Sequence, residues 1–268
     1  MFKYVGFVSR AGLRVVSSYP WIKRYAKHPE KYDISKRYSK VHIFLKKCVH
    51  NFKVEFFLEG LENLKSDSNF VLIPNHQSNM DPLSLLAICE NPISFISKKE
   101  AEKFPIVGNV IKDIDGMFID RSNLKQEVRA IMKLSKSLEE NRELSYVVFP
   151  EGTRSRDPNH LVQEFKPGSL KMAYNSKTSI LPVALYGTFR VLDKKMNMKK
   201  FPIQVKFLKP IPYEEYSKYT TVEFAKILHD LIEKEVEILR QKDKELCKKY
   251  CYKRRKNHNY DISGLWFY

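Results

Sequence analysis

The chain of 268 residues is long enough for one α/β domain with a sizeable core and an appended segment. Hydrophobic residues make up 43% and aromatic residues 13%, a composition that argues against a disordered chain. The net charge of +17 predicts an anionic partner, namely nucleic acid, anionic lipid or a phosphorylated substrate, and composition does not choose among them.

Residues 1–51 form a basic, aromatic-rich segment. Through residue 53 the chain holds thirteen Lys and Arg residues against two acidic residues, a net charge of 13 − 2 = +11. Basic residues mixed with aromatic ones are typical of a helix that lies at a membrane interface. One apolar helix face is expected, and its residues are Ile34, Tyr38, Val41, Leu45 and Cys48. This face could equally pack on the rest of the protein. No run approaches the ~20 apolar residues of a membrane-spanning helix, so the segment is predicted to lie on a membrane.

Residues 52–240 alternate between the periodicities of strands and helices. Strands are expected at 52–58, 70–73, 93–96, 116–121, 146–149, 180–186 and 203–208, with helices at 123–140 and after 220. Thr220 and Glu223 have the spacing of a capping box at the start of the last helix. The pattern predicts an α/β domain with a largely parallel central sheet flanked by helices. Residues 241–268 are expected to form a basic C-terminal tail that could make a second lipid contact.

A candidate catalytic pair follows the strand that ends at Pro74. His76 lies where parallel-sheet domains bind ligands, beyond the carboxyl end of a strand, and histidine is well suited to accept a proton at neutral pH. Asp81 could orient its ring if His76 lies in the turn and Asp81 in the first turn of a helix. Asp81 followed by Pro82 could instead be only a helix N-cap, and at this spacing alone the structural role is the commoner one.

Two further segments place cations at strand ends. The expected strand 116–121 ends in Arg121, which could hold a phosphate or form a surface ion pair. In the segment 149–155, Glu151 could accept hydrogen bonds from hydroxyls, Gly152 allows a close backbone approach, and Arg154 could bind phosphate. Lys166 adds a cation downstream, although its segment could also be an ordinary turn before a helix.

Taken together and in order, these motifs resemble the glycerolipid acyltransferases of the 1-acylglycerol-3-phosphate type. The resemblance runs from about Phe52 to about Leu208 and rests mainly on the His-x4-Asp and Glu-Gly-Thr-Arg elements. It implies that His76 is the general base and Asp81 its support. It also implies that Arg121 and the set Glu151, Gly152, Thr153 and Arg154 bind the acceptor. The fourth motif of the family falls around Leu181 and Pro182.

The resemblance implies transfer of an acyl group from acyl-CoA or an acyl carrier protein thioester to the sn-2 hydroxyl of 1-acyl-sn-glycerol-3-phosphate. The expected partners are lysophosphatidic acid, the acyl donor and an anionic membrane surface on the cytoplasmic face, without nucleic acid. No cofactor or metal is expected, and the cysteines are expected to be reduced thiols. The alternatives are acylation of glycerol-3-phosphate or another lysophospholipid, and a non-catalytic basic protein that binds membrane or nucleic acid.

Overall fold

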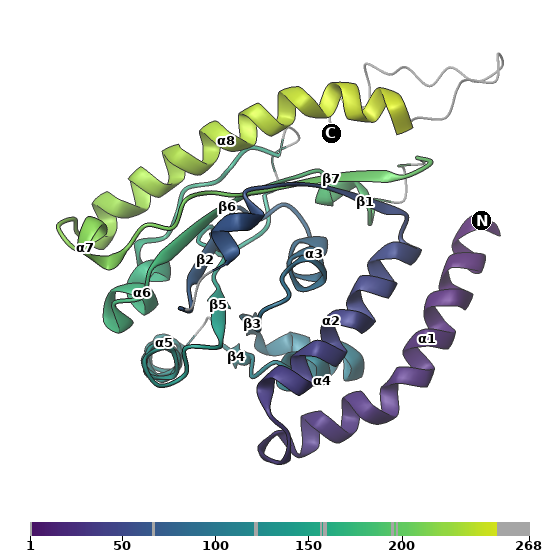
Figure 1. Ribbon diagram of the computed structural model, residues 1–268, viewed down its shortest axis with the longest axis horizontal. Coiled ribbons are helices and arrows are strands. Elements are labelled where there is room, and N and C mark those ends of the chain that lie inside the picture. Colours follow the sequence, from purple (N-terminus) through teal and green to yellow (C-terminus); the bar gives the residue numbers. More distant parts are fainter. Residues whose placement is uncertain are drawn as a thin grey trace.

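The computed structural model describes residues 2–65, 68–120, 123–155, 157, 160–193, 196 and 198–250. Its centre is a seven-stranded sheet with the strand order β1-β7-β6-β2-β5-β3-β4 (Figure 1). The strands are β1 (Val54–Glu59), β2 (Val71–Pro74), β3 (Ile93–Lys98), β4 (Met117–Ile119), β5 (Ser145–Val147), β6 (Ile180–Tyr186) and β7 (Phe201–Phe207). Only β6 and β7 pair antiparallel among the described strands, so the predicted α/β fold with a largely parallel sheet is confirmed.

Helices cover both faces of this sheet. They are α1 (Phe2–Lys27), α2 (Ile34–Asn51), α3 (Met80–Ile88), α4 (Pro105–Asp113), α5 (Leu124–Glu140), α6 (Lys171–Ser176), α7 (Tyr213–Tyr216) and α8 (Thr221–Tyr250). Figure 1 shows α2, α3 and α4 on one face, and α5, α6 and α8 on the other. Each face has its own apolar core. The side chains of β2 alternate between the two cores, since Leu72 belongs to the first and Val71 and Ile73 to the second.

The apolar face predicted for residues 34–48 packs against the sheet domain. Its five residues are between 0% and 9% exposed, and four of them (all but Ile34) share a core with Leu72 and Met80. The hydroxyl of Tyr38 also donates a hydrogen bond to the carbonyl oxygen of Cys89. The alternative of packing on the domain is therefore the correct one for this face. In the part of the chain that the structure describes, no helix has the length and apolarity needed to cross a bilayer.

Most predicted elements have observed counterparts. The helix predicted over 123–140 is α5, and the strand predicted over 180–186 is β6. The capping box is present, because the backbone N–H of Thr220 donates to Glu223 and that of Glu223 donates to the Thr220 hydroxyl. The helix that it opens continues through Arg240 to Tyr250, so the first ten residues of the predicted tail are helical. Residues 251–268 lie outside the described residues, and the division of the chain at residues 51 and 240 stays a prediction.

Candidate active site

The site is built at the carboxyl edge of the sheet, where β2 lies between β5 and β6. β2 ends at Pro74, and His76 lies in the turn that leads into α3. Nδ1 of His76 lies 2.7 Å from Oδ2 of Asp81. The imidazole stacks on the ring of Phe149 with 4.1 Å between centroids, and its side chain keeps 17% exposure. The predicted contact between His76 and Asp81 is thus present in the structure.

Asp81 is fully buried and its hydrogen bonds fix the histidine tautomer. Oδ2 also accepts from the backbone N–H groups of Gln77 and Ser78, at 2.7 and 2.8 Å. Because this oxygen already accepts two hydrogen bonds, the network assigns the Nδ1 proton to His76 as donor. Nε2 is then the nitrogen with a free lone pair, as a general base requires. The helix begins at Met80 with Asn79 as its N-cap, so the alternative that Asp81 is merely an N-cap is wrong.

Glu151 supports the turn from the neighbouring strand. It follows β5 and is 3% exposed. Oε1 accepts from the backbone N–H of His76 at 2.6 Å, and Oε2 accepts from that of Gln163 at 3.3 Å. Burial raises the pKa of Glu151 to about 7, although both hydrogen bonds favour the ionised form. With both oxygens engaged, the carboxylate is better placed to hold the His76 turn than to meet an acceptor hydroxyl.

Asn75 and Gln77, which the sequence interpretation did not single out, tie the same turn to the strand on the other side. The side chain of Asn75 exchanges two hydrogen bonds with the backbone of Leu185 on β6, at 2.7 and 3.0 Å. Oε1 of Gln77 accepts from the backbone N–H of Gly187 at 3.0 Å. Polar side chains directly beside a candidate catalytic histidine were the available signal. Their partners lie 110 positions away, and only the pairing of β2 with β6 reveals them.

A cationic loop lies beside this turn. Gly152 has a φ of +72°, and a β-carbon there would come within 2.9 Å of Nζ of Lys166. The structure therefore brings Lys166 against Gly152, as the sequence could only suggest. Thr153 and Arg154 follow and are exposed, and the backbone N–H of Ser155 bonds to the carbonyl oxygen of His76. The predicted phosphate ligand Arg121 lies outside the described residues.

Among the described residues, the side chains that could together bind a metal ion lie outside this site. One group could hold a cation, namely His229, Asp230 and Glu233 on α8, and it contains neither His76 nor Asp81. The site residues themselves offer a proton acceptor at Nε2, a buried carboxylate behind it, and cations at the adjacent loop. These groups suit a reaction in which a hydroxyl loses its proton and attacks a carbonyl next to a bound anion.

His76 and the buried Asp81 lie at the carboxyl edge of a largely parallel sheet, beside a glycine-containing cationic loop, and this arrangement suits an enzyme that transfers acyl groups. A family model described as Acyltransferase matches residues 55–186, which run from β1 to the end of β6. The chain belongs to this acyltransferase family.

Individual relatives narrow the class. The chain is 30% identical over 188 residues to the 1-acyl-sn-glycerol-3-phosphate acyltransferase of Borreliella burgdorferi. The aligned region covers 70% of this chain and 74% of the relative. It is 31% identical over 212 residues to the probable 1-acyl-sn-glycerol-3-phosphate acyltransferase of Mycoplasma pneumoniae, covering 74% and 77%. The crystal structure of the 1-acyl-sn-glycerophosphate (LPA) acyltransferase PlsC from Thermotoga maritima superposes with a TM-score of 0.65. The Thermotoga chain is 27% identical to the present one, and the match covers 87% of the present chain and 98% of the Thermotoga chain.

These similarities confirm the resemblance that the sequence motifs carry, and they confirm that the protein is an enzyme. The purely electrostatic alternative, a non-catalytic basic protein, is excluded as a description of the whole chain. The roles of the individual site residues still follow from geometry and from the motif positions.

Proposed function

We propose that the protein transfers a fatty acyl group from an acyl thioester to the sn-2 hydroxyl of 1-acyl-sn-glycerol-3-phosphate, which forms phosphatidic acid. The names of the relatives support the acceptor. The observation that carries the chemistry is the 2.7 Å contact between Nδ1 of His76 and the buried Oδ2 of Asp81, because it leaves Nε2 as the base.

In this mechanism His76 takes the proton of the acceptor hydroxyl through Nε2 while the hydroxyl oxygen attacks the thioester carbonyl. The tetrahedral intermediate collapses and expels the thiolate, and the imidazolium returns its proton to that sulfur. Positioned general-base catalysis of this kind contributes roughly 10²–10⁴-fold. Asp81 stabilises the imidazolium between the two steps. The transfer is direct, and no acyl-enzyme forms.

The acceptor phosphate binds to Arg154 and Lys166 across the face of Gly152, and Arg121 completes the phosphate site. Among the described residues, neither Arg154 nor Lys166 makes an ion pair, so both cations remain available to a ligand. A bound phosphate would fix the position of the hydroxyl relative to Nε2, and such positioning can lower the barrier by several kcal/mol. Glu151 holds the turn that carries His76 by accepting the hydrogen bond of its backbone N–H. This role adds to, or replaces, the contact with the acceptor that the motif implies.

The acyl donor is acyl-CoA or an acyl carrier protein, both of which are acidic and suit a chain of net charge +17. No protein-bound cofactor or metal takes part. The enzyme works as a peripheral or monotopic protein on the cytoplasmic face of the cell membrane, held there by its basic N-terminal segment.

The test is release of free thiol when the protein meets lysophosphatidic acid and a long-chain acyl thioester in detergent. Acyl-CoA and acyl carrier protein are supplied in separate reactions. We expect release that requires the acceptor and that falls at least ~10³-fold in His76→Ala. His28→Ala removes another partly exposed histidine and serves as the matched control, with unchanged release expected.

Three results would overturn the proposal or a part of it. Release by His76→Ala at the rate of the unmodified enzyme would remove the assigned base. Release that needs glycerol-3-phosphate or another lysophospholipid in place of lysophosphatidic acid would keep the chemistry and change the acceptor. An acylated protein trapped in the absence of acceptor would replace direct transfer by a covalent intermediate.

A further inference from the structure

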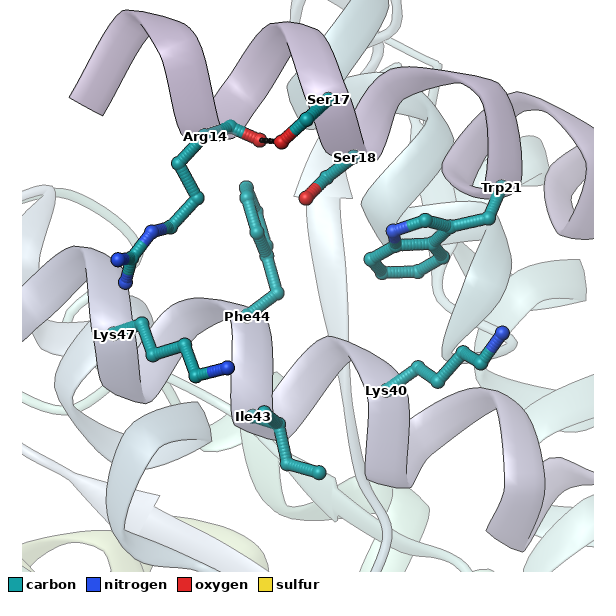
Figure 2. A pocket seen from close by; sticks show the side chains of 8 residues that line it. All are labelled: Arg14, Ser17, Ser18, Trp21, Lys40, Ile43, Phe44 and Lys47. Carbon is teal, nitrogen blue, oxygen red and sulfur yellow. Dashed lines mark hydrogen bonds between the residues drawn. The ribbon is translucent and has the colours of Figure 1, made fainter. Parts of the chain in front are cut away.

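A cavity lies between α1 and α2, on the N-terminal side of the molecule. Its volume is about 380 Å³, which falls in the range of about 300–1,000 Å³ common for small-ligand sites. Helix α1 contributes Arg14 and Trp21 to its wall, and α2 contributes Lys40, Phe44 and Lys47 (Figure 2). None of its eight lining residues is acidic.

The charges of this cavity, which we call the α1–α2 groove, are not balanced by the protein. Figure 2 shows the side chain of Arg14 reaching from α1 toward α2, that of Lys47 running along α2, and Phe44 between the two helices. Within the described residues, no acidic group lies at ion-pair distance from Arg14, Lys40 or Lys47. Lys40 rests over the rings of Trp21 and Tyr25, with Nζ 5.9 and 5.1 Å from their centroids. Three cations around one cavity without a counter-charge fit an anionic ligand.

The wall of the groove also carries apolar side chains, namely Trp21, Ile43 and Phe44. Ile43 is 47% exposed, so part of this apolar wall faces water. A free phosphate or a nucleic acid would leave these side chains in water. A phospholipid would use both features, because its headgroup phosphate would meet the cations and its glycerol and proximal acyl carbons would cover the apolar wall.

We propose that the α1–α2 groove is a binding site for the phosphate of an anionic phospholipid of the bilayer, separate from the acceptor site at His76. The ligand is one lipid held in a defined cavity, with its phosphodiester between Arg14 and Lys47 and its headgroup against Trp21. This is a stronger claim than the general attraction of a basic segment to an anionic surface. It does not depend on the reaction or acceptor proposed above.

The chain provides a reporter inside the groove. It contains two tryptophans, Trp21 and Trp266, so in a Trp266→Phe background the fluorescence comes from Trp21. The probe is dihexanoyl phosphatidylglycerol, kept below its micelle-forming concentration so that no charged surface is present. We expect a saturable change in Trp21 emission. We also expect at least ten-fold weaker binding of dihexanoyl phosphatidylcholine, and no saturable change with inorganic phosphate over the same concentration range.

A matched pair of variants separates a site from general charge. Lys47→Gln removes a groove cation and is expected to weaken binding at least ten-fold. Lys46→Gln removes the same charge from the neighbouring exposed position outside the lining, and is expected to change binding by less than two-fold. Arg154→Ala should leave the Trp21 signal intact, because it alters only the proposed acceptor site.

Four outcomes would overturn the proposal. The first is the absence of a saturable signal from folded protein. The second is equal weakening by Lys46→Gln and Lys47→Gln, which would mean non-specific attraction. The third is inorganic phosphate binding as tightly as the lipid, which would identify a free-anion site. Loss of the signal in Arg154→Ala would also count against it, since the lipid would then be at the acceptor site.

Discussion

His76 and Asp81 form the smallest unit on which the proposed chemistry depends. One oxygen of Asp81 accepts three hydrogen bonds, from the ring of His76 and from two backbone N–H groups of the same turn. The other oxygen, Oδ1, has no hydrogen-bond partner among the described residues although it is buried. The carboxylate therefore orders the turn and selects the imidazole tautomer at the same time.

Asp81→Asn tests this double role. The amide is nearly the same size, but its NH₂ group can face Nδ1 and force the proton onto Nε2, so that the base is lost. We expect kcat to fall about 10²–10⁴-fold with little change in the KM for the acceptor, as measured by thiol release. A fall of less than ten-fold, in protein with an unchanged circular dichroism spectrum, would contradict the assignment.

Glu151 and Arg154 are three residues apart but have opposite environments, since Glu151 is buried and Arg154 is exposed. If Glu151 holds the backbone N–H of His76, then Glu151→Gln should lower kcat about ten-fold or more and leave the acceptor KM within two-fold. Arg154→Ala should instead raise the acceptor KM about ten-fold or more, because it removes a charged hydrogen-bond donor to phosphate. Steady-state kinetics with varied lysophosphatidic acid distinguishes the two effects. A raised KM in Glu151→Gln would restore Glu151 to the acceptor site.

At the level of elements, α8 is joined to the sheet by an ion pair inside the protein. Arg190, in the short 3₁₀ helix after β6 (Thr188–Arg190), is 4% exposed and makes two parallel hydrogen bonds to Asp243 at 2.8 and 2.6 Å. Asp243 is 2% exposed, and its Oδ1 also accepts from the side chain of Gln204 on β7. The same 3₁₀ segment follows Gly187, whose N–H holds Gln77 beside His76. The ion pair thus anchors the strand end that supports the catalytic turn.

Asp243→Ala should lower the free energy of unfolding by about 3–5 kcal/mol, because it leaves the guanidinium of Arg190 buried without a counter-charge. The measurement is urea unfolding followed by circular dichroism. Glu140→Ala breaks the exposed ion pair between Lys136 and Glu140 on α5 and is the control, with an expected loss below about 0.5 kcal/mol. Equal losses of unfolding free energy in the two variants would show that the buried ion pair stabilises the protein no more than the exposed one does.

Helices and strands were predictable from the sequence where neighbouring residues alone determine them. The periodicity of residues 123–140 and the alternation of residues 180–186 are written in adjacent residues, and both elements form as expected. The contact between His76 and Asp81 was also within reach, because five positions separate the two residues. The contacts of His76 with Glu151 and of Arg190 with Asp243 join residues 75 and 53 positions apart. No local pattern encodes them, because they arise only when the strands take their order in the sheet.

The molecule as a whole keeps two carboxyl groups in surroundings that oppose their charge. Burial raises the pKa of Asp113 to about 8 and that of Glu151 to about 7. Both oxygens of Asp113 lack hydrogen-bond partners among the described residues, although its backbone carbonyl accepts from Arg37. The two groups lie in different regions, Asp113 at the end of α4 and Glu151 after β5. Each costs stability when it ionises, and for Glu151 this cost accompanies a proposed role in the active site.

The direction of the pH effect follows from proton linkage. In the unfolded chain these carboxyl groups titrate near 4, so between about pH 4 and pH 8 the folded protein binds more protons than the unfolded one. Their contribution to stability is therefore complete below about pH 4, and it is lost as the pH rises through 7 and 8. The net charge of +17 acts in the opposite sense, because its self-repulsion weakens as the pH rises. A comparison between variants is needed to separate the effect of the two carboxyl groups on stability from the effect of the net charge.

The double variant Asp113→Asn/Glu151→Gln removes both titrations and leaves the rest of the charge in place. Relative to the unmodified protein, its free energy of unfolding should rise between pH 5 and pH 8 by on the order of 2 kcal/mol, below the full linkage value because water and local relaxation reduce the cost of a buried charge. Urea unfolding at closely spaced pH values measures the difference. Glu139→Gln, which alters an exposed carboxyl group on α5, is the control and should show no such rise. A flat difference for the double variant as well would mean that both carboxyl groups are hydrated and ionised in the folded protein at pH 8.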